Sequence, residues 1–217
     1  MIVLNRKEAC LVTDFGQPVR EAVHLWLDEA GYSEWRSIPE LQELFPKAQP
    51  IGSDRMMFPI AGGVCKLLVA FHFEPQIAYI KFFGGALQQM LLADTSSGDV
   101  SFTHEMLRAS ETGGKVKADM FLEVLQQVGR FFDSPFDAIA GADQLRLLRH
   151  VSLLHAYETE HFPLIEASPI ARLEYIVDQH GLTPEVIRSM FASKAAIGEL
   201  LTELANDTPI DLPGSPA

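Results

Sequence analysis

Cysteine is nearly absent from this chain, which has two cysteines among 217 residues. Two cysteines cannot build the disulfide framework of a small secreted protein. Long apolar runs are also lacking: residues 64–73, ten residues long, contain a lysine and a histidine, whereas a membrane-spanning helix needs roughly 20 apolar residues. The first residues contain no apolar signal-peptide region. We therefore expect a cytoplasmic protein without a transmembrane helix.

Positive charge is scarce, because 17 lysines and arginines stand against 29 aspartates and glutamates and the net charge is -12. Such a chain has no strong general affinity for polyanions, so any nucleic-acid contact must be local. The charge is unevenly distributed: residues 1–90 hold 8 basic and 10 acidic side chains, and residues 91–217 hold 9 and 19. The two parts therefore differ in function or origin. With 47% hydrophobic residues, disorder is excluded and a packed core is expected.

Several motifs with known chemistry are missing. The chain has no P-loop, no GxSxG, no dinucleotide-binding fingerprint, no HExxH and no closely spaced cysteine pair. His155 and Glu158 fall on one face of an expected helix. Capping or salt bridging explains Glu158, Glu160 and His161 better than metal binding does. We therefore predict neither a metal site nor a cofactor.

The first part of the chain changes its hydrophobic period after two helices. Residues 17–31 place apolar side chains at three- to four-residue spacing, and a proline opens a shorter helix over residues 38–45. Residues 55–60, 64–73 and 77–83 are instead rich in β-branched and aromatic residues, with turn sequences between them. The pattern predicts an α+β domain in which two helices pack on a three- to four-stranded antiparallel sheet.

The second part is helical almost throughout. Residues 118–132 and 143–157 each carry an apolar stripe, and Ser168 followed by Pro169 is a helix start signal. A second start signal at Thr183 and a further short helix complete a helix-turn-helix pattern.

Small, polar, glycine-bearing sequences mark the boundary between the two parts. They divide the chain into four predicted segments. These are an α+β domain (1–92), a linker (93–117), a helical segment (118–166) and a helix-turn-helix-like domain (167–217).

A set of short motifs runs along the first part in a fixed order: Trp26, then residues 35–37, 41–45, 52–55, 58–60, 62–63, 66–68 and 79–82. This set resembles the HigB-type toxins, which are RelE-like mRNA interferases. The resemblance implies cleavage of RNA by attack of the ribose 2′-OH on the adjacent phosphate, with basic side chains that neutralise the developing charge and a general acid that protonates the leaving oxygen.

The second part carries a Tyr-Glu-x-Glu-His-aromatic-Pro segment within residues 147–163, followed by residues 169–177 and 181–183. These residues are similar to HigA-type antitoxins, which are helix-turn-helix repressors. Toxin and antitoxin are normally separate chains encoded side by side. The chain therefore resembles a fusion of the two.

The resemblance also implies a catalytic face on the sheet. Arg55, Lys66 and Lys81 occupy positions at which the family carries cations, and each is suited to hold a phosphate. After the last strand the chain lacks the His and Tyr of such toxins, and His72 and Tyr79 on neighbouring strands are the candidate replacements. These five are the candidate catalytic residues of an RNA endonuclease with a degenerate site. Solvated surface cations and aromatic core packing are the competing interpretation.

A DNA-reading helix-turn-helix module uses polar and basic residues at the start of its second helix. Here only Ser193 and Lys194 are suited to contact DNA. Residues 168–211 hold three basic and seven acidic side chains, a balance that repels phosphate. The alternative is a protein–protein module such as a dimerisation unit.

The leading hypothesis is a fused toxin–antitoxin-like protein, in which an mRNA interferase-like domain is held inactive in cis by the HigA-like region. The helix over residues 118–132 is expected to lie on the first domain, with Asp119 and Glu123 near Lys66 or Lys81. Two alternatives stay open: a catalytically dead scaffold that acts as an acidic protein-binding regulator or inhibitor, and a helix-turn-helix autorepressor. The expected partners are RNA or the ribosome, operator DNA and a second copy in a homodimer, and no membrane.

Overall fold

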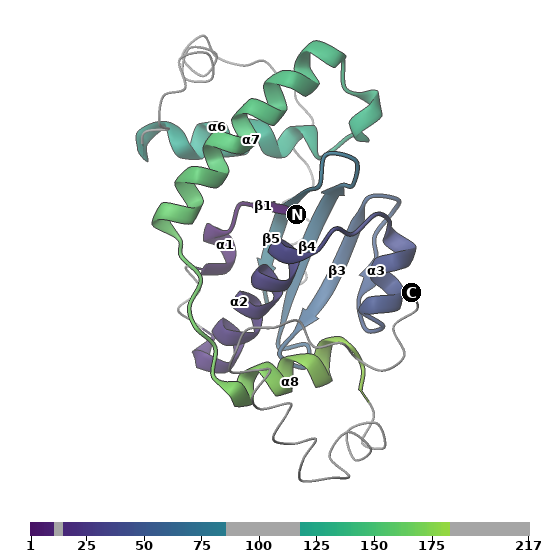
Figure 1. Cartoon of the computed structure of the whole chain (residues 1–217), viewed down its shortest axis with the longest axis vertical. Helices are drawn as coiled ribbons and strands as arrows, with labels where there is room; N and C mark the ends of the chain where they lie inside the picture. The colour runs from purple at the N-terminus through teal and green to yellow at the C-terminus, as the bar shows by residue number, and fades with distance from the viewer. Residues whose placement is uncertain (11–14, 86–117, 183–217) are drawn as a thin grey trace.

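The computed structural model describes residues 1–10, 15–85 and 118–182 (Figure 1). A five-stranded mixed sheet stands at its centre, with the strand order β1-β5-β4-β3-β2. The strands are β1 (Ile2–Leu4), β2 (Gln49–Pro50), β3 (Arg55–Ile60), β4 (Cys65–His72) and β5 (Ile77–Gly84). Strand β1 runs parallel to β5, and all other neighbours are antiparallel.

The prediction of an antiparallel sheet of three to four strands is therefore wrong in two respects, because the sheet has five strands and is mixed. The meander β3-β4-β5 is antiparallel as expected, but β1 adds a parallel edge in which Ile2 pairs with Ile77 and Leu4 with Tyr79. A parallel neighbour needs a long crossover connection, and the helices between β1 and β2 provide it. A strand of three residues is too short for hydrophobic periodicity to reveal.

The helices are α1 (Lys7–Cys10), α2 (Gly16–Tyr32), α3 (Ile38–Leu44), α6 (Ala118–Phe131), α7 (Gly141–His161) and α8 (Pro169–Gln179), with a 3-10 turn, η1 (Phe136–Ala138). Helices α2, α3, α6, α7 and α8 begin within two residues of the positions that the sequence signals predict, whereas α1 was not predicted. The hydroxyl of Ser37 accepts a hydrogen bond from the amide of Glu40, and the hydroxyl of Ser168 accepts one from Ala171. These N-caps satisfy amides that the first helical turn leaves free.

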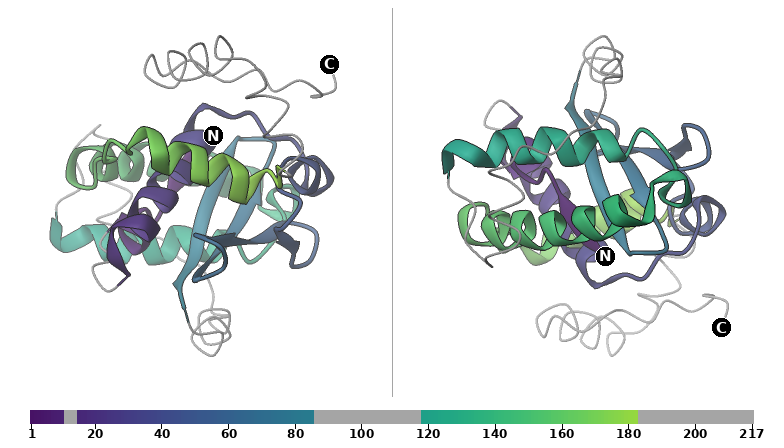
Figure 2. Two further views of the ribbon diagram at one scale, coloured as in Figure 1. Left: turned by 90° about the horizontal axis from the view of Figure 1, so that it is seen from below. Right: turned by 90° about the horizontal axis from the view of Figure 1, so that it is seen from above.

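Alternation along the strands gives the sheet two apolar faces, and each is covered by helices (Figures 1 and 2). Helices α2, α3 and α8 cover one face, where Trp26 packs against Phe58 and Trp35. Helices α6 and α7 run side by side over the other face, next to the turn between β4 and β5 (Figure 2, right). Their apolar stripes pack on Leu4, Ala70, Ile77 and Tyr79. The result is a three-layer arrangement with the sheet in the middle.

Polar contacts hold α8 on α2 and on the strand turns. The Tyr175 hydroxyl donates a hydrogen bond to Glu29 over 2.5 Å, and His180 forms an ion pair with the same carboxylate at 3.3 Å. Burial opposes protonation of His180, but the hydrogen bond and charge of Glu29 outweigh it and raise the pKa of the imidazole. Asp178 binds both Lys47 and the amide of Gly62 at 2.9 Å. Acidic and basic groups therefore join this helix to the first part of the chain.

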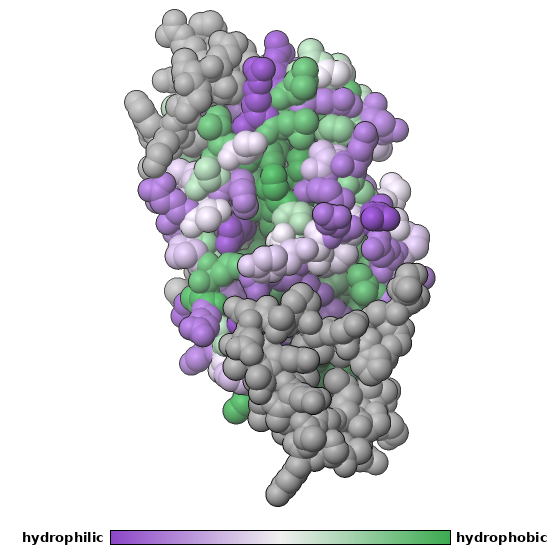
Figure 3. All heavy atoms as spheres, in the orientation of Figure 1, coloured by the Kyte–Doolittle hydropathy of each residue, from purple (hydrophilic) through white to green (hydrophobic). Residues whose placement is uncertain are grey.

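Both helical segments share an apolar core with the sheet. The boundaries predicted between residues 92 and 93, 117 and 118, and 166 and 167 stay predictions. Ser193 and Lys194 lie outside the described residues, and so does most of the helix-turn-helix pattern. Within the described ranges, no helix is long and apolar enough to cross a membrane. Hydrophilic and hydrophobic residues are mixed on the face seen in Figure 3, so that face is not uniformly charged.

Candidate functional site

Four of the five candidate catalytic residues gather on the sheet face that α6 covers. Arg55 on β3 pairs with Ala70 on β4, and Ala70 pairs with Tyr79 on β5, so the three form a row across the sheet. His72 lies two residues beyond Ala70 and therefore on the same face. Lys81 follows Tyr79 by two residues. The sheet thus places two cations, a phenol and an imidazole together.

Lys81 sits at an irregularity in the β4-β5 pairing. Val69 pairs with Ile80 and Leu68 with Phe82, so Lys81 is an extra residue without a partner on β4. Such β-bulges bend a strand and re-aim a side chain. The carbonyl of Ile80, next to the bulge, accepts a hydrogen bond from the Asn5 side chain. The bulge therefore helps to aim the ammonium of Lys81.

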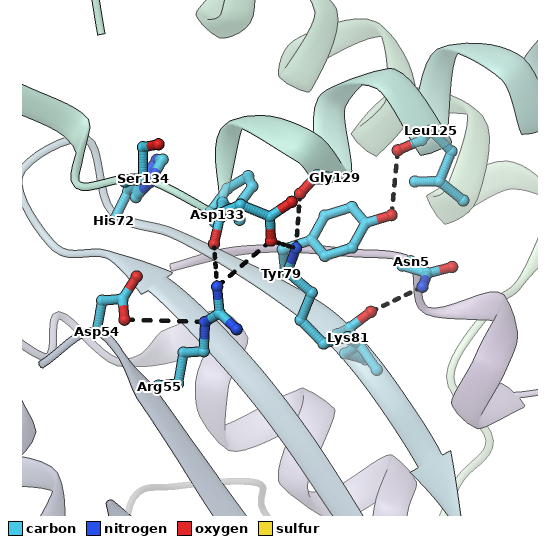
Figure 4. Close-up of polar contacts among 12 residues, drawn as sticks. Asn5, Asp54, Arg55, His72, Tyr79, Lys81, Leu125, Gly129, Asp133 and Ser134 are labelled. Atoms are coloured by element: carbon cyan, nitrogen blue, oxygen red, sulfur yellow. Dashed lines mark hydrogen bonds and ion pairs between the residues drawn. The ribbon is translucent and has the colours of Figure 1, made fainter. Parts of the chain in front are cut away.

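The carboxylate of Asp133 joins the two cations (Figure 4). Its Oδ1 lies 2.5 Å from the Nζ of Lys81 and 3.3 Å from an Nη of Arg55. The Lys81 and Arg55 side chains are only 9% and 15% exposed, while that of Asp133 is 35% exposed. Charge pairs with so little access to water are screened less than surface pairs. Asp133, just beyond α6, thus pairs with both cations, and Asp54 lies 3.8 Å from the Nε of Arg55 as a second acid.

Backbone carbonyls of α6 and of the residues just after it contact the same group of residues. Tyr79 donates a hydrogen bond to the carbonyl of Leu125, and Lys81 donates one to that of Gly129. Arg55 donates one to the Phe132 carbonyl, and His72 Nε2 lies 3.0 Å from that of Ser134. Carbonyls near a helix C-terminus carry partial negative charge, and the Gly129 carbonyl lies in the last turn of α6. Residues 125–134 thus meet all four side chains with negative groups.

The protonation states of His72 and Tyr79 follow from their burial. Burial lowers the pKa of His72, so its imidazole is neutral near pH 7. A carbonyl can only accept, so Nε2 carries the proton that is directed at Ser134. Burial, and to a lesser extent the charge of Glu158, raises the pKa of Tyr79, whose phenol stays protonated. The site therefore holds a neutral imidazole and a neutral phenol beside two cations.

Lys66 lies apart from this group. It is on the same strand as Ala70 but four residues away, which is about 13 Å along a β-strand. The expected acids also differ from those observed, because Asp133 reaches Lys81, whereas Glu123 is exposed and accepts a hydrogen bond from Gln127. The side chain of Asp119 lies outside the described residues. The one signal in the sequence that could have indicated Asp133 is its position directly after an apolar helix.

A second polar cluster lies where α7 meets β1 and α1. Glu158 of α7 is fully buried and neither of its carboxyl oxygens has a hydrogen bond of good geometry. It faces the backbone amides of Asn5, Arg6 and Lys7 and the charge of Arg6, and its burial raises its pKa to about 7. The predicted capping or salt-bridging role of Glu158 stays a prediction. Among the described residues, no group of three or more His, Cys, Asp or Glu side chains could hold a metal ion.

Comparison with known proteins connects the sheet to a toxin family. Residues 19–85 match the HigB toxin family, the RelE-like toxic component of a toxin–antitoxin system. The match covers most of α2, all of α3 and β2, and the three strands that carry Arg55, His72, Tyr79 and Lys81. No curated protein matches the chain. The toxin-like region therefore includes the candidate site, while Asp133 and the covering helices lie outside the matched residues.

Proposed function

We propose that the chain is a toxin–antitoxin component whose RNA-cleaving site is held closed by its own residues 118–134. In this proposal the toxin-like part supplies Arg55, Lys81, His72 and Tyr79, and α6 with Asp133 acts as a tethered antitoxin. The observation that carries the proposal is the placement of Asp133 between Arg55 and Lys81. An intramolecular cover has a high effective concentration, so the closed state is the resting state.

The chemistry proposed for the uncovered site is a transesterification. The neutral imidazole of His72 accepts the proton of the ribose 2′-OH, whose oxygen forms a bond to phosphorus. The bond from phosphorus to the 5′ oxygen breaks, and the Tyr79 phenol gives its proton to that leaving oxygen. Arg55 and Lys81 neutralise the phosphorane. The products are a 2′,3′-cyclic phosphate and a 5′-hydroxyl end.

The cover and the site exclude each other in this proposal. Lys81 cannot bind phosphate while its ammonium contacts Asp133 and the Gly129 carbonyl. His72 directs its Nε2 proton at the Ser134 carbonyl, and its basic Nδ1 is buried without a hydrogen-bond partner, so a ribose 2′-OH cannot reach it while the cover is in place. The same contacts that hold α6 in place therefore use the groups that catalysis needs.

Cleavage of end-labelled single-stranded RNA by the full chain tests the proposal. The wild type is expected to be nearly inactive, and Gly129→Ala combined with Asp133→Ala is expected to raise the rate at least about 100-fold, a typical contribution of acid–base groups. Adding Lys81→Ala should abolish the gain. Asp137→Ala removes an exposed acid from the segment after α6 and should leave the rate at the wild-type level.

The absence of cleavage by the folded double variant would overturn the nuclease proposal. That result would instead favour the catalytically dead scaffold. The lack of a His or Tyr directly after β5 is a separate argument for this alternative. The fusion with a HigA-like antitoxin is part of the same proposal and rests on the resemblance of residues 147–163. If the site is active, the expected target is RNA.

A further inference from the structure

The residue before Asp133 contacts the site as well. Phe132 is fully buried, and its ring stacks on the imidazole of His72, with centroids 4.1 Å apart and planes inclined by 14°. The same ring stacks on Tyr79, with centroids 5.2 Å apart and planes inclined by 25°. Two candidate catalytic residues thus serve as a stacking platform for one flat aromatic group.

Phe132 and Asp133 together combine a flat ring on this platform with an anion on a cation pair. A nucleotide has the same two parts, a planar base and a phosphate joined by a short flexible link. Bases stack readily on aromatic side chains, and Arg and Lys bind phosphate. Because aromatic rings replace the neighbouring bases of a stack, the fitting nucleotide is one that is unpaired and extruded from its strand.

We propose that Phe132 and Asp133 mimic a nucleotide and occupy a one-nucleotide subsite. The base of the bound nucleotide stacks on His72 and Tyr79, and its phosphate lies between Arg55 and Lys81. The subsite rests on the proposed function for its biological ligand, but its existence is a matter of binding and is testable without cleavage. The mimicry explains how a short segment satisfies an aromatic platform and two cations at once.

Binding of AMP to the full-length double variant Phe132→Ala, Asp133→Ala tests this proposal. AMP is expected to raise the melting temperature of this variant in a saturable manner. Its Kd should be about tenfold lower than that of inorganic phosphate or adenosine, because stacking and phosphate binding add. The wild type, in which the subsite is filled, should not respond.

Phe121→Ala, Asp133→Ala is the matched control, because Phe121 is likewise a buried ring but lies within α6 and stacks on Tyr157 of α7. This variant should show no preference for AMP over phosphate. Tyr79→Leu added to the Phe132 variant should remove the preference as well. Equal binding of AMP by the control, or no binding by the folded Phe132 variant, would overturn the subsite.

Loss of the Phe132 ring opens a cavity that could unfold the chain, so Phe132→Leu with Asp133→Ser provides a milder opening to which the same expectations apply. The outcomes also separate the two proposals. AMP binding without RNA cleavage would leave the subsite standing and remove the nuclease. RNA cleavage by the opened chain without AMP binding would remove the subsite and leave the nuclease.

Discussion

Replacing Gly129 with alanine is expected to lower the free energy of unfolding by about 2 kcal/mol, the usual size of an overpacking effect. A Cβ atom at this position would lie 2.5 Å from the Tyr79 hydroxyl oxygen and 2.7 Å from Cζ of the same ring. The ring cannot turn away easily, because its hydroxyl bonds the Leu125 carbonyl and its face stacks on Phe132. The helix must therefore move, which weakens the contacts of Lys81 and Arg55.

Gly31 in α2 offers a matched control for this prediction. A Cβ at Gly31 would meet no atom within 4 Å, so Gly31→Ala should stabilise the chain by up to about 1 kcal/mol through helix propensity. Gly129→Ala should therefore lower the free energy of unfolding and Gly31→Ala should raise it, as measured by urea unfolding at neutral pH. Equal effects at both positions would show that α6 does not approach Tyr79 as closely as described.

Replacing Glu158 with glutamine should remove a pH dependence of stability. Burial raises the Glu158 pKa from 4.5 to about 7 in the folded state. A raised pKa means that the folded state binds the proton more tightly, so the contribution is complete below pH 4.5 and disappears as the pH rises through about 7. The wild type should lose about 3 kcal/mol relative to the glutamine variant between pH 4 and pH 8.

The groups that face Glu158 determine this effect. Arg6, the amides of residues 5–7 and the nearby thiol of Cys10 lie on the first part of the chain, and Tyr79 lies on β5. Glu160→Gln, an exposed change in the same helix, should keep the wild-type pH profile. Unfolding by urea at several pH values measures all three proteins. If the free energies of unfolding of the wild type and Glu158→Gln differed by the same amount at every pH, this result would contradict burial of an ionisable carboxyl.

Most helices and strands were predictable because local sequence patterns determine them. The stripes of α2, α6 and α7, the cap at Ser168 and the strands β3 to β5 all follow from spacing and start signals that involve neighbours in sequence. The parallel β1 and the four-residue α1 were not predictable in this way, because both are too short to show a period. Their pairing and packing are decided by contacts with distant residues.

The candidate site was predictable only in part. Arg55 and Lys81 were chosen from a resemblance, and the structure places them on one face with His72 and Tyr79. The acid that meets them was expected inside the helix, but it is Asp133 after the helix end. Which acid reaches a cation depends on how α6 crosses the sheet, and the close approach at Gly129 sets that crossing. Sequence spacing within one helix contains no information about it.

Lys66 was chosen from the same resemblance as Arg55 and Lys81, and its catalytic role stays a prediction. It has the right charge, and strand alternation gives it the same face as Ala70 and His72, but its distance along β4 separates it from the other four. Phe132, in contrast, carries no charge and belongs to an apolar stripe that predicts core packing. Its stacking on His72 and Tyr79 became visible only once the helix was placed on the sheet.

The central claim is that residues 125–134 cover a nucleic-acid site of the toxin-like part. Binding of a fluorescently labelled single-stranded RNA to the full chain tests it most directly, with wild type and Gly129→Ala compared by anisotropy at one salt concentration. The Gly129→Ala variant should bind the RNA at least about tenfold more tightly than the wild type. Because the substitution changes no charge, displacement of α6 is the cause of this gain. Equal affinities for RNA in the two proteins, with α6 displaced in the variant, would contradict the claim.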